Sequence, residues 1–168
     1  MSEQKKYEFT GKIKTIFGIE FKQIRAIISF GCVVAGEIGG WIECEENLSQ
    51  SGNAWVSGNA RVSGDARVSG DARVSGNAWV SGDAWVSGNA EVKKDDDYMV
   101  IGGAGRYNRF TTFFKCRDKT IKVVCGCFFG TIIEFRAKVK ETHNGNKHEK
   151  VYLAMADMVE LQLNDDDK

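Results

Sequence analysis

The sequence predicts a mainly β protein with a narrow solenoid at its centre and a small α+β domain, ending in two helices, after it. Three observations lead to this fold class: a six-residue unit written seven times from Ser51 to Val92, an alternating apolar pattern over residues 7–22, and two helical patterns near the C-terminus. We therefore divide the chain into an N-terminal β cap and lead-in coil (1–50), the repeat (51–92), a charged hinge (93–97) and the α+β domain (98–168).

Each repeat unit ends in Val and carries Ala two places earlier, so in an extended segment both side chains share one face. The residue between them must point the opposite way. The Gly-Asn or Gly-Asp pair of each unit supplies the permissive backbone that a tight corner needs. Strands and corners therefore alternate around a narrow core. The outward residues are Trp55, Arg61, Arg67, Arg73, Trp79, Trp85 and Glu91.

Units such as SGNAWV (51–56) and SGDARV (63–68) resemble the hexapeptide repeat of left-handed parallel β-helix proteins. The resemblance implies a triangular coil of three hexapeptides, so that residues 18 apart stack. Arg73 is then expected between Trp55 and Glu91, and the pairs Arg61–Trp79 and Arg67–Trp85 are expected within cation–π reach. We expect the Trp side chains to be exposed on three faces. They either cover a thin solenoid or anchor a partner, since Trp and Arg are typical interface residues.

This pattern predicts an interface formed by the Trp and Arg side chains, either with a host protein or protein complex, or between copies of the chain in a trimer or dimer. The predicted interface residues are Trp55, Arg61, Arg67, Arg73, Trp79 and Trp85.

The flanks predict smaller elements. Residues 7–22 alternate as a β-hairpin with Gly18 at its turn, and the run from Gly39 to Glu43 resembles the lead-in of hexapeptide-repeat proteins from bacteriophage and prophage genomes. After the repeat, a strand is expected at Tyr98–Ile101, followed by a hairpin around residues 117–119. Thr131 with Glu134 forms a capping box for one helix, and a second helix is expected from about Lys147 to Leu163.

A Gly-rich loop at residues 102–109 is the strongest small-molecule signal. Glycine backbone with Arg, Asn and Thr donors can hold a phosphate or nucleotide, although the loop is not a Walker motif and also suits a plain connector. The candidate ligand-binding residues are Arg106, Asn108, Arg109, Thr111 and Thr112.

The sequence gives less support to acyl transfer and to zinc binding. The repeat contains no His, which argues against the acyltransferases of β-helix type. A zinc site would combine Cys116, Cys125, Cys127, His143 and His148. However, C-x-C departs from the C-x2–4-C spacing of structural zinc, and buried cysteines acting as small hydrophobes are favoured. We predict no catalytic residues, no metal and no cofactor.

Composition favours a cytoplasmic protein. With 23 basic and 23 acidic residues the net charge is zero, which disfavours direct binding to nucleic acid or to an anionic membrane. No apolar segment follows the polar N-terminus, as a secretory signal would require. Five cysteines without framework spacing fit a reducing compartment.

The combined hypothesis is a non-enzymatic, phage- or prophage-type binding protein that engages and modulates a host macromolecule. An inhibitor of bacterial antiviral defence, such as an anti-CRISPR protein, is its concrete form. The alternative is a small-ligand binder, such as a sponge for a nucleotide immune signal. A trimeric hexapeptide acyltransferase is the second alternative.

Overall fold

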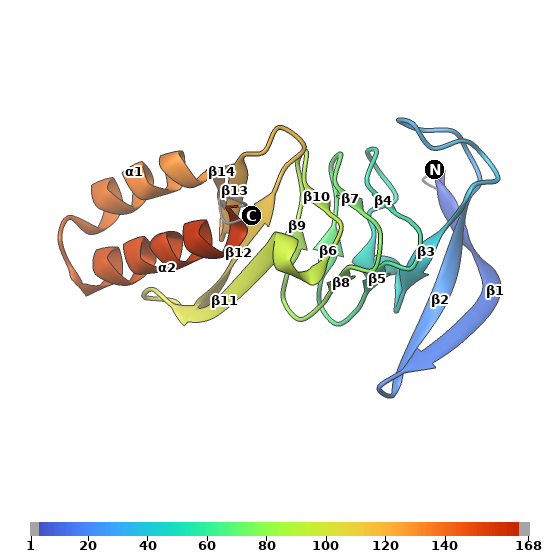
Figure 1. Ribbon diagram of the computed structural model, residues 1–168, viewed down its shortest axis with the longest axis horizontal. Helices are drawn as coiled ribbons and strands as arrows, with labels where there is room; N and C mark the ends of the chain where they lie inside the picture. The colour runs from blue at the N-terminus through green and yellow to red at the C-terminus, as the bar shows by residue number, and fades with distance from the viewer. Residues whose placement is uncertain (1–3, 165–168) are drawn as a thin grey trace. The chain divides into compact units, whose positions relative to one another are not determined.

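A computed structural model describes residues 4–164 of the chain. The fold is mostly β with two C-terminal helices (Figure 1). It divides into two compact units, Met1–Asp95 and Asp96–Lys168, and each is described by itself.

The first unit begins with an antiparallel hairpin of β1 (Tyr7–Ile16) and β2 (Ile19–Ala26). Phe17 and Gly18 form its two-residue turn with φ values of 51° and 81°, so both lie in the left-handed region that such a turn requires. The predicted hairpin and its turn at Gly18 are confirmed. β3 (Ile38–Ile42) then pairs antiparallel with β2 and parallel with the second strand of the repeat.

The repeat forms strands of two residues that stack in parallel (Figure 1). Trp55 and Glu91 both pair with Arg73, Arg61 pairs with Trp79, and Arg67 pairs with Trp85. The 18-residue register implied by the resemblance is therefore confirmed. The strands are β4 (Trp55–Val56), β5 (Arg61–Val62), β6 (Arg67–Val68), β7 (Arg73–Val74), β8 (Trp79–Val80), β9 (Trp85–Val86) and β10 (Glu91–Val92).

The Ala and Val of every hexapeptide fill the core of this repeat, and each is at most 1% exposed. Backbone hydrogen bonds connect successive coils, such as Trp55 N–H to the Ala72 carbonyl at 3.0 Å and Ser57 N–H to the Val74 carbonyl at 2.9 Å. Two short 3-10 helices flank the repeat, η1 (Glu45–Asn47) and η2 (Asp95–Asp97). Small inward side chains thus allow the close coil stacking that satisfies the backbone.

The second unit is a four-stranded antiparallel meander with two helices. Its strands are β11 (Tyr98–Ala104), β12 (Arg109–Lys115), β13 (Ile121–Cys125) and β14 (Phe128–Thr131). Helix α1 (Ile132–His143) begins at the predicted Thr131–Glu134 capping box, and α2 (Lys147–Leu163) has the predicted bounds. Gly130 and the capping Thr131 pair with β13 as the end of β14, so the strand leads directly into the helix.

A single apolar cluster holds the sheet and helices of the second unit together. Phe135 of α1 packs edge-on against Phe113 of β12 and against Tyr152 of α2, with ring centres 5.7 Å and 5.8 Å apart. Asp97, expected in a charged hinge, is only 6% exposed and forms an ion pair with Lys115 at 3.5 Å. The cluster thus packs both helices against the sheet whose β11–β12 turn carries candidate ligand residues.

Candidate functional site

Two of the three repeat tryptophans are covered by the chain's own N-terminal residues. Trp55 is 4% exposed, because Tyr7 and Phe30 pack against its ring with ring centres 6.4 Å and 5.4 Å away. Trp79 is half-buried, with Phe17 stacked on it and Phe21 against its edge, both at 6.0 Å. The expectation of exposed Trp on three faces is therefore wrong for Trp55 and holds in part for Trp79.

The arginines of these two faces are engaged as well. Arg61 lies 4.7 Å from the centre of the Trp79 ring, so the predicted cation–π pair is confirmed. Arg73 donates from Nη2 to the Cys32 sulfur. Both arginines are half-buried in this structure, and the interface role of the six residues stays a prediction.

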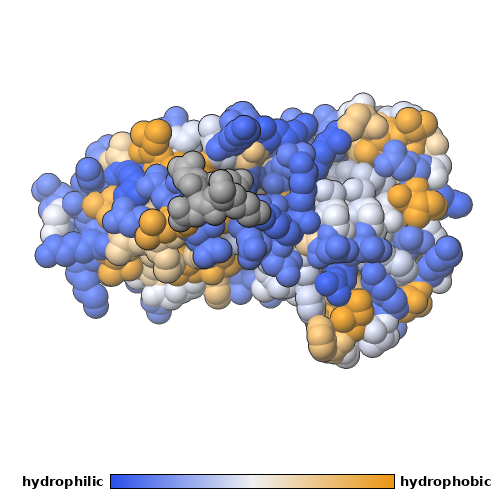
Figure 2. All heavy atoms as spheres, viewed as in Figure 1, coloured by the Kyte–Doolittle hydropathy of each residue, from blue (hydrophilic) through white to orange (hydrophobic). Residues whose placement is uncertain are grey.

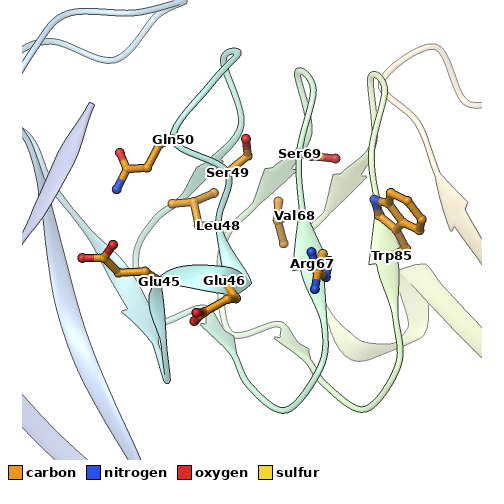
Figure 3. Close-up of a pocket in the computed structure, with 9 residues that line it drawn as sticks. All are labelled: Glu45, Glu46, Leu48, Ser49, Gln50, Arg67, Val68, Ser69 and Trp85. Atoms are coloured by element: carbon orange, nitrogen blue, oxygen red, sulfur yellow. The ribbon is translucent and has the colours of Figure 1, made fainter. Parts of the chain in front are cut away.

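The third face remains open. Arg67 is exposed, and Trp85, its partner in the 18-residue register, keeps 47% of its surface exposed. Together with Glu45 and Glu46 these side chains border a depression of about 370 Å³. Figure 3 shows the two carboxylates at one end, Arg67 beyond them and Trp85 in the following coil. We call this surface, defined by Glu45, Glu46, Arg67 and Trp85, the Arg67–Trp85 face.

This face differs from an ordinary apolar patch. On the side of the molecule drawn in Figure 2, hydrophobic residues form separate patches among hydrophilic ones. The Arg67–Trp85 face instead combines one large aromatic ring with charges of both signs, while Leu48 and Val68 beneath it are buried. Such a mixture can anchor a partner through the ring and orient it through the charges.

The second unit contains a larger cavity of about 530 Å³, which we call the helix-junction cavity. It lies between the β11–β12 turn, which contributes Arg106, Tyr107 and Arg109, and the helices around their junction. Of the predicted ligand residues, Arg106 and Arg109 are brought together here. Asn108 adopts a φ of 49° in the turn and is not a lining residue.

Thr111 and Thr112 do not belong to this cavity. They are buried, with exposures of 0% and 2%, so the structure does not bring them to this cavity, and their ligand role stays a prediction. Thr111 Oγ1 donates to the Cys125 sulfur at 3.2 Å instead. Both threonines lie within β12, which begins at Arg109, so the loop ends before them.

Sequence reasoning missed most of the cavity's remaining walls. They come from α1, the helix junction and α2, and the lining includes Lys138, His143, His148 and Tyr152. The His143 ring lies 5.5 Å from Tyr152 at an interplanar angle of 27°, and 5.7 Å from His148. Both histidines stood out as candidate metal ligands, but their nearness to the Gly-rich loop depends on how the helices cover the sheet.

Tyr152 forms the floor of the cavity and is 8% exposed. Burial raises the pKa of Tyr152, and the charge of Cys125 and a hydrogen bond with it act in the same direction. The hydroxyl sits so near Gly105 that a Cβ there would clash with it. A Cβ at Gly126 would likewise clash with the Arg109 guanidinium, so glycine at both places lets the walls close around the space.

The cysteines give no sign of a metal centre in the described part of the chain. No three His, Cys, Asp or Glu side chains of residues 4–164 gather as metal ligands would. All five cysteines are free, and burial raises the pKa of the Cys116 thiol. Of the expected buried pair, Cys125 is only half-buried and Cys127 is exposed in the turn between β13 and β14, so the expectation is wrong for Cys127.

Comparison with known families identifies the repeat. A family model described as the YdcK beta solenoid repeat matches residues 54–70, 60–74, 66–82 and 72–88. The matches overlap within the stacked strands of the first unit, so this part of the chain is a β-solenoid repeat region. A comparison with curated proteins finds no match. Among the described residues, no helix has the length and apolar character needed to cross a bilayer.

Proposed function

We propose that the protein is a non-enzymatic binding protein whose β-solenoid presents the Arg67–Trp85 face to a host protein. The observation that carries this proposal is the selective exposure of Trp85. Its ring is 47% exposed beside an exposed arginine, whereas Trp55 is 4% exposed beneath Tyr7 and Phe30. The same repeat position is thus covered on one face and left open on another.

The chemistry of the face suits a protein partner. Trp and Arg are the residues that most often dominate binding energy at protein interfaces, and truncating one such anchor typically costs about 2 kcal/mol or more of binding free energy. The hydrogen-bonded coils beneath Trp85 hold its backbone in place, so little conformational entropy is lost when a partner binds. Glu45, Glu46 and Arg67 supply charges of both signs to fix its orientation.

Several finer features belong to the same proposal. We infer a left-handed winding of the coils, because the six-residue unit and the 18-residue register match those of hexapeptide-repeat β-helices. The resemblance of Gly39–Glu43 to phage lead-in sequences supports a phage or prophage origin and a target in bacterial antiviral defence, such as a CRISPR complex. Five free thiols support action in the reducing cytoplasm of the host.

The test is purification of the tagged protein from a bacterial host under gentle conditions, followed by native mass spectrometry. Trp85→Ala and Arg67→Glu are compared with Phe129→Ala, a control of matched exposure at 49% in the second unit. A protein retained at fixed stoichiometry by the wild type and the control, and lost about tenfold or more with either face variant, supports the proposal. Equal retention by all three variants overturns it. A bare dimer or trimer that requires Trp85 would assign the face to self-association and would also overturn it.

A further inference from the structure

The helix-junction cavity has a chemistry of its own, independent of the Arg67–Trp85 face. We propose that it binds a small organic anion that carries a planar aromatic ring, with a nucleoside monophosphate as the representative ligand. The charge of the lining, the placement of its rings and the cavity volume support this class of ligand.

Charge is the first step. The cavity is lined by Arg106, Arg109 and Lys138, and no acidic side chain belongs to its described lining. This concentration of one sign occurs in a chain whose net charge is zero. Arg guanidinium groups bind phosphate through paired hydrogen bonds, which makes them the natural contacts of a phosphate group. The lining therefore favours an anion.

The two arginines also converge on one ring. The guanidinium carbons of Arg106 and Arg109 lie 5.8 Å and 5.2 Å from the centre of the Tyr107 ring. Two positive groups beside the same ring repel each other, and an anion bound between them would relieve that repulsion. Tyr107 itself is 70% exposed in the β11–β12 turn, so its ring is accessible to a ligand beside the two arginines.

Aromatic groups from β14 and from both helices also line the cavity. The rings of His143 and Tyr152 lie nearly parallel, and Phe128 and Phe135 complete an apolar surface next to them. Inorganic phosphate would leave this surface unused. A flat heterocycle would cover it while its anionic group reached the arginines, and such a base gains about 1–3 kcal/mol from stacking on an aromatic side chain.

The volume agrees with a ligand of this size. At about 530 Å³ the cavity falls within the range of roughly 300–1,000 Å³ that is typical of small-molecule sites. At Gly105 a Cβ would clash with the buried Tyr152 hydroxyl, so the absence of a side chain there allows the close approach of the turn to α2. The lining, the rings and the volume thus point to the same class of ligand.

The test is isothermal titration calorimetry of the full chain with the four nucleoside 5′-monophosphates, adenosine and inorganic phosphate as probes. We expect at least one monophosphate to bind with a Kd below about 1 mM, and adenosine and phosphate to bind about tenfold more weakly or not at all. Arg109→Gln and Tyr107→Ala, both at exposed positions of the turn, should each weaken binding about tenfold.

Two controls separate this proposal from the others. Arg117→Gln removes an exposed arginine outside the cavity, and Trp85→Ala alters the Arg67–Trp85 face, so both should bind the monophosphate like the wild type. The proposal is overturned if no monophosphate binds at 5 mM, if inorganic phosphate binds equally well, or if Arg117→Gln weakens binding as much as Arg109→Gln. Tighter binding of a single-stranded oligonucleotide, with a steep dependence on salt, would also overturn it.

Discussion

The ring of Phe17 lies parallel to the ring of Trp79, with an interplanar angle of 2° and ring centres 6.0 Å apart. Phe17 belongs to the hairpin turn, where it holds a φ of 51° and leaves 87% of its surface exposed. A bulky residue has a conformational cost in the left-handed region, and the contact with Trp79 acts against that cost.

This relationship predicts the outcome of a double-mutant cycle. Phe17→Asn places a residue that tolerates positive φ before Gly18, which improves the turn but removes the stacked ring. In a Trp79→Leu background there is no stack left to lose, so the substitution should be more favourable there than in the wild type by about 0.5–1.5 kcal/mol. Urea denaturation of the four proteins measures the difference. An identical effect of Phe17→Asn in both backgrounds would show that the stack contributes nothing.

Removing the polar side chain of Asn47 should cause a large loss of stability. It is fully buried, and its Oδ1 accepts from the Glu43 and Cys44 N–H groups at 3.1 Å and 3.0 Å. Its Nδ2 donates to the carbonyls of Gly64 and Ala66, both at 2.9 Å. Asn47→Ala leaves these buried groups short of partners and should lower the free energy of unfolding by about 2 kcal/mol or more.

Asn59 is the matched control for this prediction. It occupies an exposed corner, and its side chain donates to Asn77 at 3.5 Å. Asn59→Ala should therefore change the free energy of unfolding by no more than about 0.5 kcal/mol, measured in the same denaturation series. If both alanine variants were equally stable, the four hydrogen bonds of Asn47 would not hold the lead-in coil to the repeat.

Structural features that depend on short-range sequence patterns could be predicted from the sequence alone. The 18-residue register is implied by the resemblance of the six-residue unit to hexapeptide β-helices, in which three units form one coil, and the strand pairing agrees with it. The start of α1 follows from the Thr131–Glu134 capping box, and the bounds of α2 follow from the Asn146 N-cap and its apolar spacing. Each of these depends on residues only a few positions apart, or on a strict repeat.

Features that depend on distant packing could not be predicted. Periodicity shows that Trp55 points outward, but its burial depends on Tyr7 and Phe30, which no local pattern connects to it. The Gly-rich loop singled out Arg106 and Arg109, which the structure brings to the helix-junction cavity, whereas Tyr152 joins them only because α2 packs on the sheet. The covered faces and the cavity are thus consequences of tertiary structure.

Replacing glycine by alanine at two corners of the repeat should destabilise the protein to different extents. Gly76 and Gly82 have φ values of 64° and 65°, so alanine pays the same left-handed penalty, about 1 kcal/mol, at either place. A Cβ on Gly76 would lie 2.6 Å from the Lys93 carbonyl oxygen, whereas a Cβ on Gly82 would meet nothing within 4 Å. Gly76→Ala should therefore destabilise by about 1–3 kcal/mol more than Gly82→Ala. Thermal or urea denaturation of the pair gives the difference, and equal losses would contradict the close stacking of the corners.

The burial of Lys6 should give the free energy of unfolding an unusual dependence on pH. The residue is 2% exposed, and its Nζ donates to the Ala54 carbonyl at 2.8 Å. Burial lowers the pKa of Lys6 from 10.5 to about 8. Between these two values the unfolded chain binds more protons than the folded protein, so the free energy of unfolding should rise with pH, by at most about 1.4 kcal/mol per pH unit.

Ionisation of the neighbouring Tyr7 limits the pH range in which the effect of Lys6 on stability can be measured. Burial raises the pKa of Tyr7 above its ordinary value of 10, helped by the negative charge of Glu45. Above pH 10 the folded state therefore holds the proton that the unfolded chain loses, and stability should fall again. Urea denaturation at pH 7.5, 8.5 and 9.5 isolates the Lys6 effect. Lys6→Met cannot titrate there, so its stability should rise less steeply than that of the wild type. Parallel pH profiles for the two proteins would show that Lys6 keeps its ordinary pKa despite its burial.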